Sequence, residues 1–516
     1  MKKIYWLAAG LLVLESCKKT DITDAASAEA NRNAGTTSAE RQESTSFTEV
    51  GMIDIGNTGA AEISAYDPLT KKLFVVNNST NDNKIDVINL ANPASPVYLS
   101  SISVVPYGGF VNSVYVSNGK VAAAIEAPVK TNAGKVVVFK TTDHSEIAVR
   151  TVGSLPDMII FSPDGKYILT ANEGEPNPAY TIDPMGTVSI LEVDNDYAVT
   201  TLNFSGFASQ AAALKLKGLR IYGPGASFAQ DIEPEYVAVS SNSKTAWVTL
   251  QENNAIAKID IETKTITEIF PLGFKNFNTD ENAIDPSDND GGIFFNKWPV
   301  KGIYTPDAIA VIPSNGTPFL FTANEGDARE YTAFVEARRV SAASVILDPV
   351  AFPNAAIDFK PNSKLGRLNI TSTLGDTDGD GDYDELYAPG ARSFSIWNGN
   401  TGALVFDSKN ELDKKAFDIG RYPDSRSDDK GTEPEGIAIG RVGNKNMLFV
   451  GMERADAVAV YDITNPIKPV FLKILNCGVG PEGVLFVDAE KSPNGKSMLI
   501  VSSEVDGVIK IYSTEL

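Results

Sequence analysis

The sequence contains very little histidine and cysteine. Among its 516 residues there is one histidine, His144, and there are two cysteines, Cys17 and Cys477. Ser-His-Asp triads, Cys-His pairs and histidine-rich zinc sites all need imidazole groups, so a single histidine argues against these classes. If Cys17 is acylated, as argued below, no intrachain disulfide can form. We therefore expect the fold to be stabilised by packing and by bound ions.

Basic residues are also in the minority. The chain has 45 Lys and Arg against 66 Asp and Glu, which gives a formal net charge of -21. Nucleic acids and anionic lipid surfaces are bound through basic side chains that contact phosphate, so we expect no nucleic-acid partner. No apolar run after the amino-terminal segment is long enough to span a bilayer. The composition suits a globular protein, expected to be monomeric, that binds cations.

The first 17 residues resemble a bacterial lipoprotein signal peptide. Two lysines precede the apolar stretch 4–14, which is too short to span a bilayer, and Leu14-Glu15-Ser16-Cys17 ends it. We expect cleavage before Cys17, whose acylated amino group would anchor the protein to a membrane of the bacterial cell envelope, facing the periplasm or the cell surface. Glu15 is unusual in such a motif, and an ordinary signal peptide is the alternative. Residues 18–46 have almost no large apolar side chains and predict a disordered tether before a single domain at 47–516.

A repeated motif runs through this domain. It consists of Pro followed by Asp or Glu, an apolar strand, a hairpin turn, a second apolar strand and a Glu. Weaker copies start at Glu62 and Asn112, and a third strand follows each pair. The five clear copies are Pro156-Asp157 with Glu173, Pro234-Glu235 with Glu252, Pro306-Asp307 with Glu325, Pro434-Glu435 with Glu453, and Pro481-Glu482 with Glu504. Seven units of four short strands predict an all-β protein, a seven-bladed β-propeller.

The two ends of the domain and the spacing of the repeats complete this prediction. The last unit has only three strands and ends at Tyr512, so we expect the strand at 47–55 to pair with 508–512 and to close the last blade. The long spacings predict inter-blade insertions, each between the second strand of one unit and the first of the next, with a hairpin at 392–397 and 404–407 in the third. The insertions are expected at 203–231, 274–304 and 330–432.

The acidic pair of each repeat carries the functional prediction. In a propeller, the start of the innermost strand and the end of its antiparallel neighbour lie at the same end of the central channel. Like charges in such a ring raise one another's pKa unless cations neutralise them, and Ca²⁺ takes six to eight oxygen ligands. We therefore expect Ca²⁺, or another divalent metal, at this end. The alternative is structural, because these carboxylates could cap strands or accept backbone hydrogen bonds. The ring would comprise Asp157, Glu173, Glu235, Glu252, Asp307, Glu325, Glu435, Glu453, Glu482 and Glu504.

Basic residues occur in the same loops. Arg329, Arg426 and Arg454 are expected around the mouth of the channel, with Arg392 and Lys430 nearby. Carboxylates, metal and arginines together can bind phosphate or a carboxylated ligand, so a small phosphorylated or anionic ligand is a candidate partner. Salt bridges between loops are the simpler explanation for each basic residue.

A second acidic cluster lies in the third insertion. Residues 376–385 match the first half of an EF-hand loop, with Gly381 at its sharp turn, but Tyr387 stands where the bidentate Glu is expected. We predict a structural calcium site there, with the ligands Asp376, Asp378, Asp380, Asp382 and Asp384. Cys477 precedes the last blade and could reach the central site, although a buried, inert thiol is the favoured interpretation.

Several long motifs resemble the choice-of-anchor I domain family, which includes mesenchyme-specific cell surface glycoprotein-like proteins and β-propeller lipoproteins labelled alkaline phosphatase. The resemblance covers nearly everything after residue 46 and implies an extracytoplasmic propeller held by varied anchors. One departure is Thr432, where proline is expected in the run Lys-Gly-Pro-Glu-Pro-Glu. The motifs lie at 155–157, 171–177, 322–331, 392–397 and 430–436.

Two functional hypotheses follow. The first is a calcium-dependent phosphoesterase, in which the metal polarises a phosphoryl oxygen and activates water. Its catalytic residues would be Asp157, Glu173, Glu325, Arg329, Glu435 and Arg454, its ligand-binding residues Arg392, Arg426 and Lys430, and its metal ligands Glu235, Glu252, Asp307, Glu453, Glu482 and Glu504. The second is a non-catalytic, calcium-stabilised surface binding or adhesion module. The fold alone cannot decide between them, since propellers support both.

Overall fold

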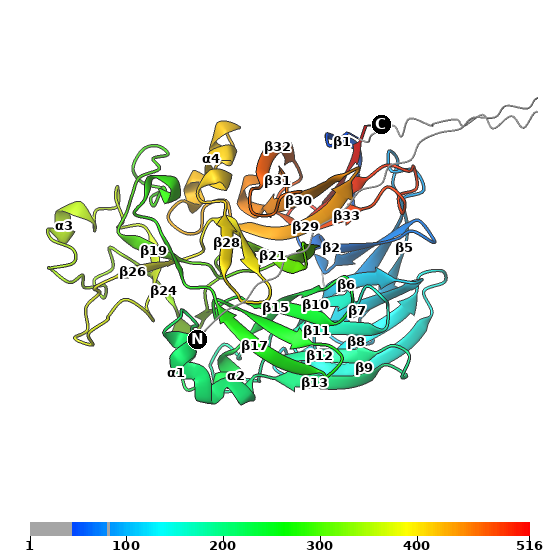
Figure 1. Ribbon diagram of the computed structural model, residues 1–516, viewed down its shortest axis with the longest axis horizontal. Helices are drawn as coiled ribbons and strands as arrows, with labels where there is room; N and C mark the ends of the chain where they lie inside the picture. The colour runs from blue at the N-terminus through cyan, green and yellow to red at the C-terminus, as the bar shows by residue number, and fades with distance from the viewer. Residues whose placement is uncertain (1–43, 80–82, 516) are drawn as a thin grey trace, which may run out of the picture. The chain divides into compact units, whose positions relative to one another are not determined.

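A computed structural model describes residues 44–79 and 83–515 (Figure 1). Within these residues there are seven four-stranded antiparallel sheets. The first three comprise β2 (Ala60–Asp67), β3 (Lys72–Asn77), β4 (Lys84–Asn89) and β5 (Val97–Ser103); β6 (Val111–Ser117), β7 (Lys120–Ile125), β8 (Ala133–Lys140) and β9 (Glu146–Ser154); and β10 (Pro156–Phe161), β11 (Tyr167–Asn172), β12 (Thr187–Glu192) and β13 (Ala198–Asn203).

The other four sheets follow the same pattern. They comprise β14 (Pro234–Val239), β15 (Thr245–Leu250), β16 (Ala255–Asp260) and β17 (Thr265–Pro271); β20 (Ile309–Ser314), β21 (Thr317–Asn324), β27 (Ser393–Asn398) and β28 (Leu404–Asp407); β29 (Pro434–Val442), β30 (Lys445–Met452), β31 (Ala457–Asp462) and β32 (Val470–Asn476); and β33 (Pro481–Val487), β34 (Met498–Ser503), β35 (Val508–Thr514) and β1 (Phe47–Asp54).

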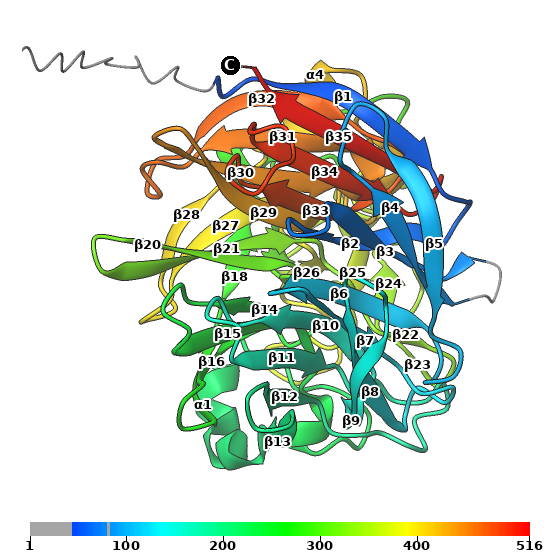
Figure 2. The same ribbon diagram turned by 90° about the vertical axis from the view of Figure 1, so that its right-hand side faces the viewer.

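The first strands of the sheets contact one another in a closed cycle. The order is β2, β6, β10, β14, β20, β29, β33 and again β2, and Figure 2 shows the sheets stacked around this inner layer. Radial repetition of four-stranded antiparallel sheets is the β-propeller architecture, so the predicted all-β propeller fold is confirmed.

The amino-terminal strand closes the last sheet, as the missing fourth strand predicted. β1 pairs antiparallel with β35, with Phe47 opposite Thr514 and Asp54 opposite Val508. Phe47 is fully buried, and its ring lies 5.1 Å from that of Phe449 in the neighbouring sheet. The two ends of the described chain are therefore joined by a backbone ladder and by core packing.

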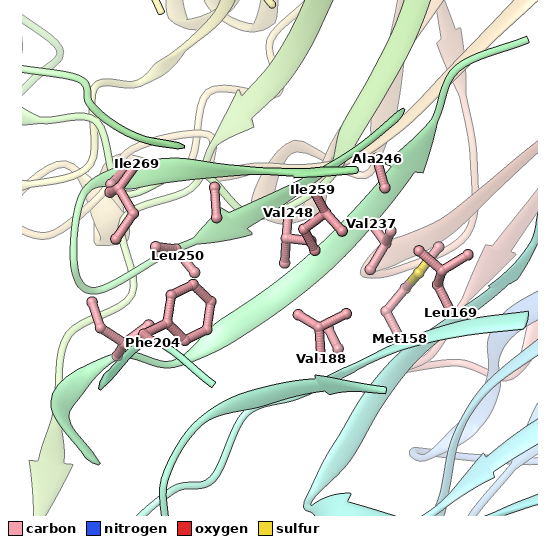
Figure 3. Packing of buried hydrophobic residues seen from close by; sticks show 14 of the residues in the cluster. Met158, Leu169, Val188, Phe204, Val237, Ala246, Val248, Leu250, Ile259 and Ile269 are labelled. Carbon is pink, nitrogen blue, oxygen red and sulfur yellow. The ribbon is translucent and has the colours of Figure 1, made fainter. Parts of the chain in front are cut away.

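Apolar side chains fill the space between neighbouring sheets. Figure 3 shows this packing between the third and fourth sheets, where Met158, Leu169 and Val188 meet Val237 and Val248. These strands are apolar on both faces because each sheet is covered on both sides. Burying a Val or Leu side chain stabilises the fold by about 1.5–3 kcal/mol, so these layers contribute a large part of the stability.

The insertions carry most of the remaining short elements. They are η2 (Ser205–Gln210), α1 (Ala211–Lys215), α2 (Phe228–Asp231), β18 (Phe274–Asn276), η3 (Asp280–Asn282), β19 (Val300–Ile303), β22 (Glu330–Tyr331), β23 (Phe334–Val335), β24 (Ala337–Arg339), α3 (Ala355–Asp358), β25 (Asn369–Thr371), β26 (Leu386–Pro389), α4 (Glu411–Asp418) and η4 (Asp424–Arg426). The short η5 (Glu453–Ala455) connects β30 to β31 within the sixth sheet. None of the described helices is both long and apolar enough to cross a membrane.

The location of the third insertion differs from the prediction. The predicted hairpin forms as β27 and β28, but β27 pairs with β21, so residues 325–392 lie inside the fifth sheet rather than between two sheets. The β26 strand from this insertion pairs parallel with β19 from the second insertion, and apolar residues including Phe277, Val300 and Leu347 form a small separate core. The two insertions thus fold together. The predicted signal peptide with Cys17 and residues 18–43 of the predicted tether lie outside the described residues.

Candidate functional site

A recurrent irregularity positions the first carboxylate in four of the five clear repeats. In the third sheet Pro156 pairs with Asn172, but the next paired residue is Ile159, so Asp157 sits in a bulge. The same shift follows Pro234, Pro434 and Pro481. A β-bulge bends the strand and re-aims a side chain. The residue before the proline has a left-handed backbone in the third repeat, Leu155 with φ 47°, and in the sixth, Glu433 with φ 49°.

The bulged carboxylates meet in one cavity of about 340 Å³, called here the central chamber. Seven of the ten predicted ring residues line it: Asp157, Glu235, Asp307, Glu325, Glu435, Glu453 and Glu482. Glu173 and Glu252 each offer an oxygen within 4.8 Å of Glu235. Glu504 raises the pKa of Glu482 through its charge. The structure therefore brings all ten carboxylates to one end of the inner strands.

Burial and mutual repulsion raise the pKa of eight of these carboxyl groups. Desolvation is the largest cause of the raised pKa in every case, and neighbouring carboxylates add to it. The pKa of Asp157 rises to about 6 and that of Glu453 to about 7. The pKa lies well above its usual range for Glu173, Glu235, Glu252, Asp307, Glu435 and Glu482.

Three carboxylate triads at this end have oxygens within 4.8 Å of one another, about twice a calcium–oxygen bond length. They are Glu173–Glu235–Glu252, Asp307–Glu325–Glu435 and Glu325–Glu433–Glu453. In the first triad no residue forms a salt bridge with any described residue, and the Oε2 atoms of Glu235 and Glu252 are buried without a hydrogen-bond partner. In the second, Glu435 Oε2 is likewise unpartnered, whereas Glu325 accepts a bond of 2.6 Å from Lys430. The third triad is neutralised by Lys430 and Arg454.

The fourth sheet departs from the predicted register. In the third sheet Pro156 is opposite Asn172, and Glu173 is the next residue. In the fourth sheet Pro234 is opposite Leu250, so the residue equivalent to Glu173 is Gln251. The Gln251 amide lines the central chamber and donates a bond of 2.8 Å to Glu325. Glu252 stands one residue later and still reaches the first triad. The sequence alone does not show which of two adjacent polar residues at a strand end faces the chamber; the strand pairing decides it.

Arg329, predicted as a catalytic residue, and Arg392, predicted to bind ligand, both have their guanidinium groups bound within the fold. Arg329 is 3% exposed, and its guanidinium is bound by the buried carboxylates of Asp231, at 2.5 Å, and Glu233, at 2.9 Å. Arg392 is 2% exposed, lines neither cavity, and donates to the backbone carbonyls of Asp285, Ser427 and Asp429. The prediction of a ligand-binding role for Arg392 is therefore wrong, since its side chain is directed into the loop at 408–433. The donors of Arg329 are likewise consumed.

Arg426, Lys430 and Arg454 lie at the mouth, and the buried Arg329 also lines the cavity there. With Glu175, Glu252 and Asp327 they line a second cavity of about 360 Å³, called here the side chamber. Asp327, Lys430 and Arg454 line both chambers, so the two are contiguous.

Several residues of the site were not predicted. Glu62 starts the first, weaker repeat and has a pKa raised to about 8, first by burial and then by Glu504. Glu126 ends the second strand of the second repeat and is 5% exposed. Both occupy motif positions, so alignment of the weak copies would have found them. Glu433, which precedes the motif proline, carries no such signal.

The acidic loop of the third insertion is mostly exposed and pre-organised by hydrogen bonds. Asp376 accepts bonds from the amides of Gly379, at 2.6 Å, and Gly381, at 3.1 Å. Carboxylate oxygens lie within 4.8 Å of one another in two groups, Asp376–Asp378–Asp384 and Asp348–Asp382–Asp384. Asp380 belongs to neither group, and Asp348 was not predicted. Cys477 is buried, and burial raises the pKa of its thiol.

The family model for the Choice-of-anchor I domain matches residues 62–466. This protein belongs to the choice-of-anchor I domain family. Gigasin-3a of Magallana gigas is 26% identical over 182 residues, which are 29% of this chain and 64% of that protein. Mesenchyme-specific cell surface glycoprotein of Strongylocentrotus purpuratus is 26% identical over 329 residues, 54% of this chain and 42% of that protein. The chain thus spans less than two thirds of the length of either relative.

Solved structures that resemble this choice-of-anchor I protein do so at low sequence identity. Hydrazine synthase of Kuenenia stuttgartiensis has a TM-score of 0.48 and 12% identity, covering 89% of this chain and 96% of that one. The Cps50 (Swd1) beta-propeller domain of Myceliophteria thermophila has a TM-score of 0.45 and 8% identity, covering 90% and 99%. Family membership and the propeller fold of the described residues indicate a surface-associated propeller module, and hence a cell-surface or envelope protein.

Proposed function

We propose that this protein is a divalent-cation-binding propeller of the cell envelope, with Ca²⁺ as the preferred ion and Glu173, Glu235 and Glu252 as its principal ligands. The observation that carries the proposal is the pair of buried, unpartnered oxygens of Glu235 and Glu252 in a triad without a salt-bridged basic partner. Leaving such oxygens unsatisfied is costly, and a hard cation that accepts carboxylate oxygens removes the cost.

The second triad is a further candidate site. Asp307 and Glu435 form no salt bridge with described residues, and Glu435 contributes another unpartnered oxygen. Lys430 already satisfies one oxygen of Glu325, so an ion here would be bound less completely than in the first triad. The envelope location is completed by the proposed acylation of Cys17, which would anchor the propeller to lipid.

Calcium titration of the purified chain tests the central site. In Glu235→Gln an isosteric, neutral side chain replaces one ligand, so calcium affinity should fall at least tenfold. The same change removes repulsion within the triad, so the melting temperature in chelator should stay equal or rise. Glu262→Gln, in the exposed turn after β16 of the same sheet, is the matched control and should change neither quantity. Unchanged calcium affinity in Glu235→Gln would refute the assignment of this triad.

A second candidate function is metal-dependent hydrolysis of a phosphoric ester. It is favoured by the pKa values of Asp157, about 6, and Glu453, about 7, in a chamber of about 340 Å³. A carboxyl with a pKa near the working pH can accept or donate a proton during the reaction, and a bound cation would supply charge stabilisation. A non-catalytic, calcium-stabilised binding or adhesion module is the alternative. Turnover of p-nitrophenyl phosphate that requires calcium and is lost in Asp157→Asn would support hydrolysis, and no turnover in calcium would support the binding module.

We also propose a structural calcium site in the loop at 376–384, centred on Asp384, which belongs to both oxygen groups there. Such an ion would tie the loop to Asp348 and so stiffen the third insertion. Because this loop lies outside both chambers, its ion should be lost in Asp384→Asn without affecting calcium binding by Glu235.

A further inference from the structure

One buried carboxylate, Glu433, gathers three cationic side chains beside the carboxylate ring. Its Oε1 accepts a bond of 2.6 Å from Arg426 Nε. Its Oε2 lies 3.4 Å from both Arg454 Nε and Lys430 Nζ. The Glu433 side chain is completely buried. A single acceptor therefore holds two guanidinium groups and one ammonium group at the boundary of the two chambers.

The backbone of Glu433 is fixed by its neighbours. It has φ 49°, in the left-handed region that costs a non-glycine residue energy, and it directly precedes the β29 strand. Its carbonyl accepts the Glu453 amide at 3.0 Å, which ties it to the end of β30. Strained residues persist where the surrounding structure determines them, and they concentrate at functional sites. The position of the three cations thus follows from the inner ladder and not from mobile surface side chains.

The arginines retain donors after these contacts. Arg426 uses Nε on Glu433 and Nη2 on Asp429, at 2.8 Å. Arg454 uses Nε on Glu433 and Nη1 on Glu453, at 2.7 Å. Among residues 44–79 and 83–515, neither Arg426 Nη1 nor Arg454 Nη2 has a hydrogen-bond partner. Lys430, by contrast, contacts Glu325, Asp327 and Glu433 and has no donor to spare.

Both arginines line the side chamber of about 360 Å³, and their side chains are 33% and 40% exposed. Guanidinium groups recognise carboxylate and phosphoryl oxygens through paired N–H donors. The same chamber is also lined by Glu175, Glu252 and Asp327, so an anion there is repelled until positive charge is added nearby. Glu252 belongs to the proposed calcium triad, which places that added charge at the wall of the side chamber.

We propose that the side chamber is an anion subsite, in which Arg426 and Arg454 bind a group with at least two oxygen acceptors, a carboxylate or a phosphoryl group, and that it fills only when calcium occupies the carboxylate ring. Glu433 is its positioning residue. The inference rests on the proposed calcium site, and it makes the ligand of this protein an anion bound together with a cation. By reciprocity, the anion raises calcium affinity by the same factor as calcium raises anion affinity.

Titration calorimetry on the full chain tests the subsite with two probes, methylphosphonate and acetate, each with saturating calcium and with chelator. Calcium should raise the affinity of at least one probe by about tenfold or more, within the usual range of such coupling. Binding of methylphosphonate alone identifies a phosphoryl ligand, and binding of acetate alone identifies a carboxylate.

Arg426→Lys and Arg454→Lys keep the charge but remove the planar donors, so each should weaken anion binding about tenfold while calcium binding and melting temperature persist. Arg421→Lys, at a half-buried pair with Asp456 outside both chambers, is the control and should bind the probe like the wild type. The Glu433→Gln variant distinguishes an electrostatic effect from a positioning effect, because the two predict opposite changes in anion affinity. Loss of a negative charge should strengthen anion binding if charge alone matters, whereas loss of the positioning residue should weaken it.

The outcomes separate the two proposals. Calcium binding without binding of either probe overturns the anion subsite and leaves the calcium site intact. Probe binding that is unchanged in both Arg→Lys variants overturns it too, as does tighter binding in Glu433→Gln. A chain that binds no calcium in the absence of probe refutes the proposed function itself, and with it the coupling.

Discussion

Removal of divalent cations should make the stability of this protein fall as the pH rises from about 4 to 8. A chelator would remove the cations, and titration of the ring carboxyl groups would then cause the loss of stability. For Asp157, the pKa of about 6 in the folded chain exceeds its ordinary value of 3.8. Between these pH values the folded state therefore holds a proton that the unfolded state has released. Unfolding releases protons there, so the free energy of unfolding decreases with rising pH.

The magnitude follows from the shifts. Asp157 shifts by about 2 pKa units, worth about 3 kcal/mol that is present below pH 4 and lost once the pH passes 6. Glu453, with a pKa of about 7 against an ordinary 4.5, contributes a loss of similar size that is complete above pH 7. A propeller of roughly 470 residues has an unfolding entropy on the order of 1 kcal/mol/K, so each such group lowers the melting temperature by about 3 °C.

Differential scanning calorimetry at pH 5, 6, 7 and 8, in chelator and in saturating calcium, measures this effect. In chelator the melting temperature should decline by several degrees between pH 5 and 8, and calcium should largely abolish the decline. Asp157→Asn should flatten the chelator curve, since its side chain does not titrate. Glu490→Gln, at an exposed turn, is the control and should follow the wild type.

The reasoning would be refuted by a melting temperature in chelator that is constant or rises between pH 5 and 8. It would also be refuted by a decline of equal size in calcium, because a cation bound to the ring should keep the carboxylates ionised in the folded state at these pH values.

Three further predictions concern the fold and the loop site. Phe47→Ala should lower the free energy of unfolding, measured by urea denaturation, by about 3–5 kcal/mol, because it removes a fully buried side chain from the closing strand. A loss below about 1 kcal/mol would argue against closure by β1. Arg329→Met should lower the free energy of unfolding by about 3–5 kcal/mol, because it leaves the buried carboxyl oxygens of Asp231 and Glu233 without their donor, and an unchanged free energy of unfolding would argue against these contacts. Asp384→Asn should reduce the calcium-induced rise in melting temperature while Glu235→Gln reduces it independently, so the effects of the two changes should add in the double variant.

Much of the fold could be predicted because its signal is local and repeated. The Pro-acid motif marks the start of an inner strand, and the Glu that follows the second strand marks the same end of the channel. The unpaired last unit required a strand from elsewhere in the chain, and Phe47–Asp54 was the alternating segment left over. Each inference needed only strand periodicity and the count of strands per unit.

The errors arose where strand pairing, and not the local sequence pattern, determines the position of a residue. The insertion at 330–432 was expected to separate two blades, but β27 inside it pairs with β21, and no local feature of Arg392–Trp397 identifies its partner strand. Gln251 and Glu252 are adjacent polar residues, and a shift of one residue exchanges their directions. The role of an arginine depends on what surrounds its guanidinium, which for Arg329 comes from a distant insertion.

The sequence by itself determined the all-β class, the repeat, the closing strand and the gathering of carboxylates, because strand direction and radial repetition act on every copy alike. Only the tertiary structure decided which carboxylate oxygens are left without partners. Which oxygens lack partners depends on where the folded insertions place their basic side chains. Lys430, remote from β14 and β15 in the chain, forms salt bridges with Glu325 and Glu433 in one part of the site. Glu235 and Glu252 form no salt bridge with any described residue, and each keeps a buried oxygen without a hydrogen-bond partner, which is why we propose the cation there.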